Sequence, residues 1–368
     1  MQGLTKFIKL GLDGLKDNFT QLSKPYKINF AITYRCQSRC LTCNIWKTKP
    51  SNELELSEII EFAQKNPYFK WIGLTGGEPF LRSDITEIVE AFANNSKDLY
   101  LVTIPTNSLT DKDFVLRKLE NILNLGIPKV VVTLSLDGYR ELHDKIRGVP
   151  GNFDKVMALA KDFAELKKKY SNFHFKFGYT ISKYNLGQLE KTYQAVKNEL
   201  GNVERTDFHI NIGQLSDIYY NNAGEDIMPD RKALAEELSS FISKRPIKLN
   251  AMDLVEEVFQ QKLIDFSLTG KSPMKSRSLD ASLFLDSYGN VYPSIMWGKK
   301  LGNIRETGYD LVPIWKGKAA EEARRLISEK AEPEAWTSCE AYQSIIGNVA
   351  SFGGILYNRL KISKIKQK

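Results

Sequence analysis

The sequence is poor in histidine and cysteine and contains no long apolar run. Its 368 residues include 3 His and 4 Cys. No segment approaches the about 18 uncharged apolar residues typical of a membrane-spanning helix. Lysine and aspartate interrupt the first segment, MQGLTKFIKLGLDGLKDNF, every few positions, and no small-residue cleavage site follows, which argues against a secretory signal. We therefore expect a cytoplasmic protein.

The rest of the composition is that of a folded protein. Hydrophobic residues make up 42% and charged residues 26% of the chain, as in ordinary globular proteins. The 19 Phe, 16 Tyr and 5 Trp exclude intrinsic disorder. The formal net charge of +8 favours anionic partners without choosing among a nucleotide, a phosphorylated substrate, nucleic acid and a membrane.

Strand-like and helix-like segments alternate between residues 27 and 212. The expected strands are rich in Val, Ile, Phe and Tyr, and several are apolar throughout, as buried parallel strands are. They are Lys27–Thr33, Trp71–Leu74, Leu99–Ile104, Lys129–Ser135, Phe173–Ile181 and Asp207–Ile212. Repeated βα units predict a parallel sheet with right-handed crossovers, and about six units fall short of a full TIM barrel. The expected fold class is therefore α/β, a partial (β/α)6 TIM-type barrel with a smaller α+β C-terminal extension.

Three of the four cysteines lie in one loop directly after the first expected strand. Cys36, Cys40 and Cys43 occur in YRCQSRCLTCNIW. In an α/β sheet, ligands bind at the carboxyl ends of the strands, so this loop is well placed. Three thiolates can hold three irons of a [4Fe–4S] cluster and leave the fourth iron open. The alternative is zinc, which usually needs four ligands in paired spacings, and no His lies nearby.

Other motifs end the next three expected strands. Thr75-Gly76-Gly77-Glu78-Pro79 ends the second, and Pro105-Thr106-Asn107-Ser108 ends the third. The fourth ends in Ser135-Leu136-Asp137-Gly138, which precedes His143-Asp144 and Arg147-Gly148. Glycines allow close backbone approach, and Glu78 supplies a carboxylate. Each motif alone is also compatible with an ordinary turn or a surface charge.

Together these motifs resemble the radical S-adenosylmethionine (radical SAM) superfamily. The resemblance implies one [4Fe–4S] cluster on Cys36, Cys40 and Cys43, with S-adenosyl-L-methionine (SAM) as the second cofactor. It assigns Glu78 to the methionyl ammonium and Arg147 to the methionyl carboxylate, which suits a planar bidentate donor. The residue before the last cluster cysteine is often aromatic in this superfamily, and here it is Thr42.

Further candidate cofactor-binding residues follow from the same resemblance. Ile45 and Trp46 are candidates for covering the adenine in place of that aromatic residue. Ser135 and Asp137 are candidates for the ribose side. The remaining candidates belong to the glycine-rich and threonine–asparagine turns and are Gly76, Gly77, Pro79, Thr106 and Asn107. No catalytic residue is assigned.

The segment Phe284–Trp315 and the segment AWTSCE resemble the SPASM or twitch extension of radical SAM proteins. Ser294 and Ala335 stand where that extension has cysteines, and Ser278 marks a third such position. Cys339 alone remains, and one cysteine cannot hold an auxiliary cluster. We expect a vestigial extension retained as a substrate lid, with Cys339 as a structural thiol.

We expect five regions along the chain. They are an N-terminal amphipathic appendage (1–24), a radical SAM partial-barrel core (25–215), a helical linker (216–275), a SPASM/twitch-like extension (276–350) and a basic apolar tail (351–368). Lysines and apolar residues alternate at both ends of the chain. This pattern predicts either helices packed on the barrel or peripheral contact with an anionic membrane. Nucleic-acid binding is not favoured, because no aromatic residues interleave with the basic ones.

The sequence thus predicts a radical SAM enzyme. A 5′-deoxyadenosyl radical, formed by reductive cleavage of SAM, would abstract hydrogen from a peptide, lipid or small-molecule substrate. Such a reaction implies an electron donor such as flavodoxin or ferredoxin. The alternative is a non-enzymatic zinc- or cluster-binding scaffold protein.

Overall fold

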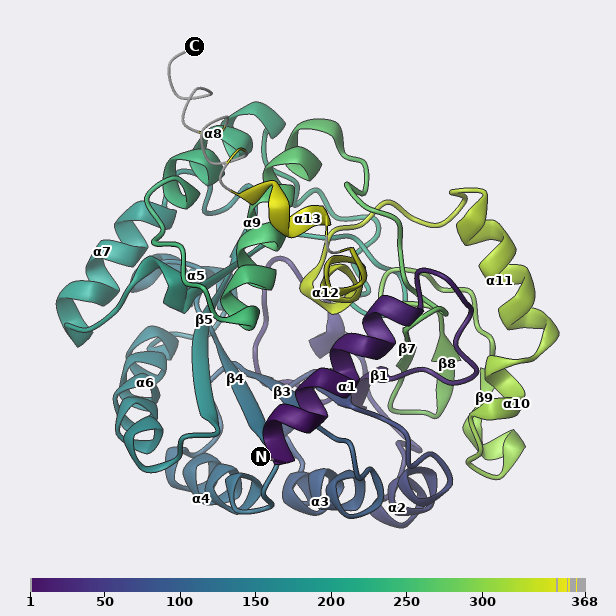
Figure 1. Cartoon of the computed structure of the whole chain (residues 1–368). Coiled ribbons are helices and arrows are strands. Elements are labelled where there is room, and N and C mark those ends of the chain that lie inside the picture. The colour runs from purple at the N-terminus through teal and green to yellow at the C-terminus, as the bar shows by residue number, and fades with distance from the viewer. Residues whose placement is uncertain (1, 349, 356, 358–361, 363–368) are drawn as a thin grey trace.

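The computed structural model describes residues 2–348, 350–355, 357 and 362. Within them a nine-stranded sheet has the order β6-β5-β4-β3-β2-β1-β7-β8-β9. Six parallel strands form its first part, and they are β1 (Lys27–Thr33), β2 (Trp71–Gly76), β3 (Leu101–Thr106), β4 (Lys129–Ser135), β5 (Phe173–Ile181) and β6 (Phe208–Ile212). Helices surround them in Figure 1. The predicted fold class, a partial barrel of βα units, is confirmed.

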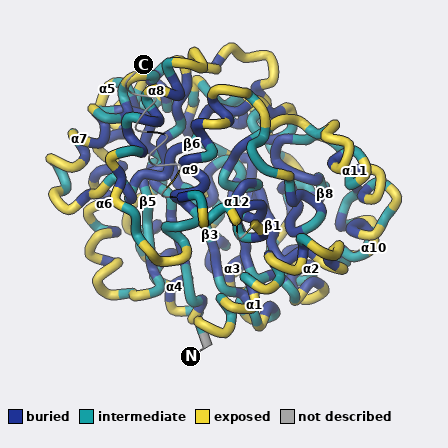
Figure 2. The backbone as a smooth tube through the Cα atoms, turned by 45° about the horizontal axis from the view of Figure 1, so that its top comes forward, coloured by how far each residue is buried: buried dark blue, intermediate teal, exposed yellow. Residues whose placement is uncertain are grey.

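The helices between these strands cover the outside of the sheet. They are α2 (Leu56–Lys65), α3 (Ile85–Asn95), α4 (Lys112–Leu123), α5 (Glu141–Arg147), α6 (Asn152–Lys169) and α7 (Leu189–Leu200). Their apolar faces pack on buried strands such as β1, all seven residues of which are buried. Figure 2 shows the buried strands inside and the exposed residues on the outer turns and helix surfaces. Short helices η1 (Ile45–Lys47), η2 (Pro79–Leu81) and η3 (Arg205–Asp207) follow strand ends or precede β6.

The C-terminal part continues the same sheet. Strand β7 (Ser282–Leu285) pairs in parallel with β1, and β8 (Asn290–Tyr292) and β9 (Gly302–Asn303) add antiparallel strands. Strands β7 and β8 form a hairpin that turns at Gly289. The pairing of β7 with β1 was not predicted, because a parallel partner so distant in sequence leaves no local signal.

Helices close both ends of the molecule. Helices α8 (Arg231–Ile242) and α9 (Ala251–Thr269) follow β6, and α10 (Val312–Trp315), α11 (Lys318–Ser328), α12 (Ser338–Gly347) and α13 (Ala350–Gly353) follow β9 and η4 (Ile304–Thr307). Helix α1 (Gln2–Lys16) lies against α12 across the barrel (Figure 1). Of the predicted tail, Ile355 and Ile362 are buried in the main core. Its other apolar and basic residues, Leu356, Arg359, Leu360, Lys361, Lys364, Ile365, Lys366 and Lys368, lie outside the described residues.

Candidate functional site

The cysteine loop runs from the end of β1 to η1 and is fixed by the end of α5. The amide of Arg39 donates to the carbonyl of Arg147 at 2.8 Å, and the amide of Leu41 donates to the carbonyl of Ile146 at 2.9 Å. Gly148 has a φ of +68°, and a Cβ there would lie 2.5 Å from the carbonyl oxygen of Arg39. A glycine is therefore required at the point where helix and loop meet.

The three thiols of this loop share one buried environment. Burial raises the pKa of Cys36 to about 11 and that of Cys43 to about 12, and it also raises the pKa of Cys40. The charge of Cys40 adds to the rise in the pKa of Cys36 and of Cys43, and the guanidinium of Arg147 donates to the Cys40 sulfur at 3.8 Å. The amide of Asn107 donates to the Cys36 sulfur at 3.7 Å. Neutral thiols of this kind become thiolate ligands only when a metal replaces their protons.

The two glycines at the end of β2, Gly76 within the strand and Gly77 after it, are required by the end of β1. Gly76 has a φ of +115°, and a Cβ on it would lie 2.1 Å from the carbonyl oxygen of Thr33. A Cβ on Gly77 would lie 2.1 Å from the carbonyl oxygen of Arg35. The amide of Gly77 donates to the carbonyl of Thr33 at 2.8 Å. These glycines therefore dock the second motif directly onto the cysteine loop.

Glu78 is a buried carboxylate with no cation bound to it among the described residues. Its oxygens accept from the amides of Asn107 at 2.7 Å and Phe80 at 3.2 Å. Burial raises the pKa of Glu78 to about 7, although these amides and the hydroxyl of Thr106 oppose the rise. A carboxylate has about four acceptor sites, so this one retains capacity for a further donor.

Asp137 and Arg147 lie together on the other side of the loop. The Nε of Arg147 lies 2.7 Å from a carboxylate oxygen of Asp137. Burial alone would lower the pKa of Arg147, but Asp137 and Cys40 more than offset it and raise the pKa. His143 supports this strand end. It accepts from the amide of Asp137 through Nδ1 at 3.0 Å, and its Nε2 lies 3.1 Å from Asn152.

A cavity of about 680 Å³ unites these groups and continues into the barrel. Every candidate site residue from the sequence lines it except Pro79, which is buried in η2. The lining candidates are Cys36, Cys40, Cys43, Ile45, Trp46, Gly76, Gly77, Glu78, Thr106, Asn107, Ser135, Asp137 and Arg147. The indole nitrogen of Trp46 is buried there without a hydrogen-bond partner. The volume lies within the range of small-molecule sites.

Two tyrosines at this cavity were not predicted. Tyr219 and Tyr220 follow β6, and both line the cavity. The Tyr219 hydroxyl is hydrogen-bonded to Thr75, and the carbonyl of Tyr220 accepts from the amide of Asn44 at 2.8 Å. The only sequence signal was their position after the sixth strand, at the same carboxyl edge as the other motifs.

The positions where the sequence suggested lost cysteines also come together. Ser278, Ser294 and Ala335 line one small cavity of about 30 Å³, although they come from three separate segments. Glu332 and Glu340 line it as well. Cys339 does not. It lines the large cavity, and burial raises its pKa to about 11.

The described residues do not offer a single-ion metal site. No group of three or more His, Cys, Asp or Glu side chains among them is arranged to hold one ion. Tetrahedral zinc needs all its ligands to converge on one point, whereas cluster ligands each bind a different iron.

The family comparison agrees with this geometry. Residues 30–196 match the family described as the Radical SAM superfamily. The chain contains a radical SAM domain. It is accordingly an enzyme of SAM-dependent radical chemistry, and the cofactors of that chemistry are a [4Fe–4S] cluster and SAM.

Similar proteins of known name share parts of the chain. It is 27% identical over 322 residues to an AdoMet-dependent heme synthase of Methanosarcina barkeri, covering 82% of this chain and 84% of that protein. It is 27% identical over 205 residues to an Fe-coproporphyrin III synthase of the same organism, covering 52% of this chain and 47% of that protein. A probable GTP 3′,8-cyclase of Methanococcus aeolicus is 33% identical over 136 residues, covering 35% and 42%.

Solved structures share the fold over most of the chain. The anSMEcpe structure with bound AdoMet has a TM-score of 0.61 at 16% identity and covers 94% of this chain and 100% of that one. Streptococcus suis SuiB bound to S-adenosylmethionine has a TM-score of 0.58 at 19% identity, covering 84% and 69%. At this identity the likeness concerns the fold.

The residues of the site fit the two cofactors. Three thiols on one loop match a cluster with one open iron. The buried, cation-free carboxylate of Glu78 matches an ammonium, and the unpartnered indole of Trp46 matches a ligand with hydrogen-bond acceptors.

Proposed function

We propose that this radical SAM enzyme abstracts hydrogen from an organic substrate held inside the barrel. The observation behind this proposal is a single cavity. The predicted cofactor-binding residues line one end of it, and it continues along the inner faces of the strands. When bound, the cluster and SAM supply a 5′-deoxyadenosyl radical after one electron enters. The chain itself holds the cofactors, positions the substrate and excludes water.

We assign the binding roles as follows. Cys36, Cys40 and Cys43 hold the cluster, and Glu78 accepts from the methionyl ammonium. Arg147 has five N–H donors, of which Asp137 and Cys40 occupy only part, so the others serve the methionyl carboxylate.

The nucleoside part of SAM would lie between two further groups of residues. Asp137 and Ser135 face the ribose. Ile45 and Trp46 face the adenine, and the unpartnered indole N–H of Trp46 supports this assignment. Gly76, Gly77, Thr106 and Asn107 shape the floor between the cysteine loop and Glu78, and Pro79 fixes the turn behind it.

The deciding experiment is anaerobic purification with iron and sulfide analysis, followed by reduction in the presence of SAM. The proposal predicts about four irons and four sulfides per chain and formation of 5′-deoxyadenosine. Flavodoxin or ferredoxin should replace a chemical reductant as the electron donor. Zinc, or no metal, would favour the scaffold alternative.

We also propose that α1 contacts an anionic membrane surface. Leu4, Ile8 and Leu12 on this helix are exposed at 66%, 50% and 57%, beside the basic residues Lys6 and Lys16. Such helices bind membranes through apolar burial and charge. No helix in the described part of the chain is long and apolar enough to cross a membrane.

Vesicles provide the test of this contact. Anionic vesicles should retain the protein, moderate salt should release it, and replacing these three apolar residues with Ser should abolish retention. Equal retention on neutral vesicles, or none on either kind, would contradict it.

A further inference from the structure

The cavity reaches the end of the barrel opposite the cysteine loop. Lys27 and Trp71 are the first residues of β1 and β2, lie opposite each other in the strand register and line the cavity. At a rise of about 3.3 Å per residue, Lys27 lies roughly 20 Å along β1 from Thr33, where the strand ends beside the cysteine loop. A substrate that reaches both ends must therefore be elongated.

Lys27 is a buried cation without a bound carboxylate among the described residues. Its side chain is covered, with the residue 1% exposed. The ammonium donates to the carbonyl of Cys339 at 2.6 Å and to Gln343 at 3.1 Å, and it lies 3.9 Å from the centre of the Trp71 ring. An ammonium has three donors, so one remains for another acceptor. A buried charge is costly unless a counter-charge accompanies it, and the carboxylate of Glu340, which forms no ion pair with Lys27, offsets this cost only in part: burial still lowers the pKa of Lys27 to about 8.

Two other buried donors on the cavity wall have no partner. The indole nitrogen of Trp71 and the hydroxyl of Thr337 are both buried without a hydrogen bond, and both residues line the cavity. Trp71 is 4% exposed and Thr337 is 6% exposed. Thr337 immediately precedes α12, the helix that supplies both acceptors of Lys27. Unmet donors beside an unpaired cation favour an anionic ligand.

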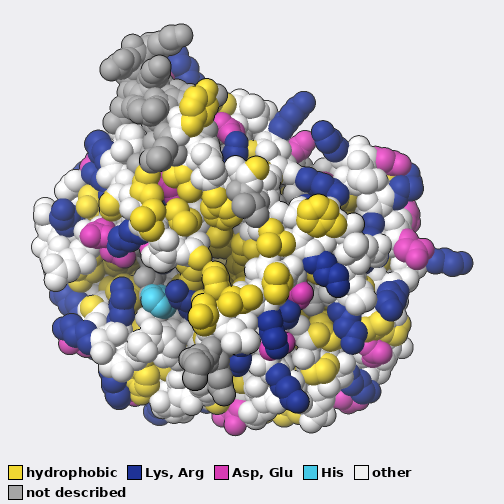
Figure 3. Space-filling view, viewed as in Figure 1, with side chains coloured by type: hydrophobic (Ala, Val, Ile, Leu, Met, Phe, Trp, Pro, Cys, Tyr) yellow, Lys and Arg dark blue, Asp and Glu magenta, His cyan; other side chains and the backbone are white. Residues whose placement is uncertain are grey.

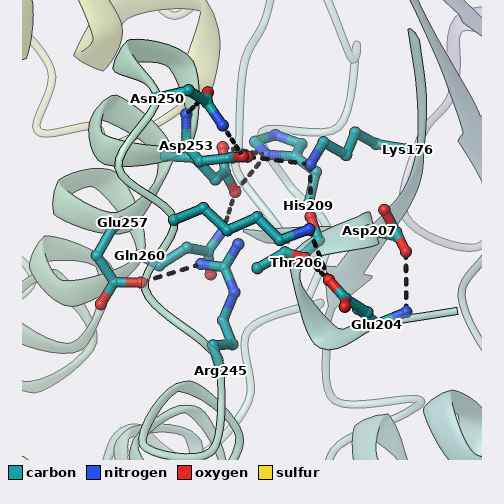
Figure 4. Close-up of polar contacts among 12 residues, drawn as sticks. Lys176, Glu204, Thr206, Asp207, His209, Arg245, Asn250, Asp253, Glu257 and Gln260 are labelled. Atoms are coloured by element: carbon teal, nitrogen blue, oxygen red, sulfur yellow. Dashed lines mark hydrogen bonds and ion pairs between the residues drawn. The ribbon is translucent and has the colours of Figure 1, made fainter.

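The neighbouring charges on the cavity wall are already paired. His209 on β6 binds Glu256 at 3.0 Å, and Lys176 on β5 donates to the carbonyl of Thr206 at 2.6 Å and lies 3.4 Å from Asp253. Figure 4 shows Lys176, His209 and Asp253 within this network between β6 and α9. The paired charges leave Lys27 as the better candidate for an external anion.

Part of the wall around Lys27 is apolar. Trp71, Leu101 and Val131 form a buried cluster with Met252 and Ile346, and all of these line the cavity. Figure 3, viewed as Figure 1, shows hydrophobic side chains gathered around a hollow beside α1 and α12. This part of the surface suits an apolar body.

We propose that the inner end of the cavity binds the carboxylate of an elongated apolar substrate. Lys27, Trp71 and Thr337 donate to it, and its body extends through the barrel toward the SAM site. This inference rests on the proposed function only in calling the bound acid a substrate.

The test is equilibrium binding to the reconstituted enzyme with SAM present. The probes are dodecanoate, which is ionised at neutral pH, and dodecanol, which has the same chain without the charge. The wild type should bind dodecanoate about 10-fold or more tightly than dodecanol. Lys27→Gln keeps a donor to Cys339 but removes the charge, so this preference should disappear. Trp71→Phe should reduce it several-fold without weakening dodecanol binding.

Lys70→Gln is the matched control. It removes a neighbouring lysine that is paired with Asp13 and does not line the cavity, so the preference should not change. Equal affinity for both probes, no binding of dodecanoate, or a preference that survives in Lys27→Gln would each overturn the inference. If Lys27→Gln does not fold, Trp71→Phe provides the test, and an unchanged preference for dodecanoate in that variant would overturn the inference.

Iron content and 5′-deoxyadenosine formation, measured on the same preparations, test the proposed function separately. Selective dodecanoate binding without SAM cleavage would contradict the proposed function and leave the carboxylate site standing. SAM cleavage without selective dodecanoate binding would contradict the carboxylate site and leave the proposed function standing.

Discussion

One pocket of this molecule is lined by the three cysteines of one loop, and a second is lined by three residues that stand where the resemblance to the SPASM extension would place cysteines. Cys36, Cys40 and Cys43 line the large cavity of about 680 Å³. Ser278, Ser294 and Ala335 line a cavity of about 30 Å³, which holds about one or two waters. Both pockets contain a buried carboxyl group with a raised pKa, Glu78 in the first and Glu340 in the second.

The fold brings the three residues of the second pocket together from separate segments, as it brings the thiols of the first pocket together on one loop. The segments that carry Ser278, Ser294 and Ala335 meet at this cavity, and the hydroxyl of Ser278 donates to Glu340 at 3.2 Å. This hydrogen bond satisfies one acceptor of Glu340 and stabilises the packing of the segments around the small cavity. Iron–sulfur ligation, however, needs thiolates and more room.

The largest expected effect follows from removing the thiols of the first pocket. Replacing Cys36, Cys40 and Cys43 with Ala should abolish iron, sulfide and reductive SAM cleavage, because the second pocket has no thiols to hold a cluster. The visible absorbance of the reconstituted protein measures this. Residual cluster absorbance would show that Cys339 and other ligands hold a second cluster.

A smaller effect is expected from the carboxylate of the first pocket. Glu78→Ala should weaken SAM binding about tenfold or more while iron content stays the same, because a charged hydrogen bond is lost. The pKa of Glu78 is raised to about 7, and the ammonium binds its ionised form. SAM affinity of the wild type should therefore fall as the pH drops from about 8 to about 6, and Glu78→Gln should flatten this profile. An unchanged affinity in Glu78→Ala would remove this residue from the site.

A modest effect on stability is expected at the second pocket. Burial raises the pKa of Glu332 from 4.5 to about 7. A carboxyl group whose pKa is raised by folding favours the folded state when protonated, so its contribution is lost as the pH rises through about 7. Glu332→Gln should therefore raise the thermal midpoint at about pH 8 relative to the wild type and change it little at about pH 5. Thermal unfolding at both pH values checks this, and an equal shift at both would contradict it.

The smallest change is expected from introducing cysteines into the second pocket. The variant Ser278→Cys, Ser294→Cys, Ala335→Cys should still hold one cluster, since the cavity has room for only about one or two waters. Iron analysis after reconstitution measures this. Twice the iron content would show that the pocket expands and that only the thiols are missing.

The fold and the position of the site could be predicted from sequence because both are encoded locally. Each strand of the barrel is a short β-branched and aromatic run, and each motif follows directly on a strand, where the ligand edge of a parallel sheet lies. The sequence predicted that Gly76 and Gly77 allow a close backbone approach, but not which backbone approaches them. Their neighbours Thr33 and Arg35 belong to the end of a different strand, β1.

Other parts of the site depend on long-range packing and gave no readable signal. Tyr219 reaches Thr75 only through the tertiary fold, and Lys27 acquires its environment from α12 at the other end of the chain. In sequence, Lys27 is a basic residue at the start of a strand, which ordinarily indicates a solvated surface position.

The pairing of β7 with β1 also affects how the chain folds during synthesis. Strand β1, which precedes the cysteine loop, can pair with β7 only after most of the chain has been synthesised. Such high contact order slows folding, and until β7 arrives the apolar β1 presents an open edge that invites aggregation. We therefore expect that stable cluster assembly follows the synthesis of β7, and that a fragment ending before Ser282 is insoluble.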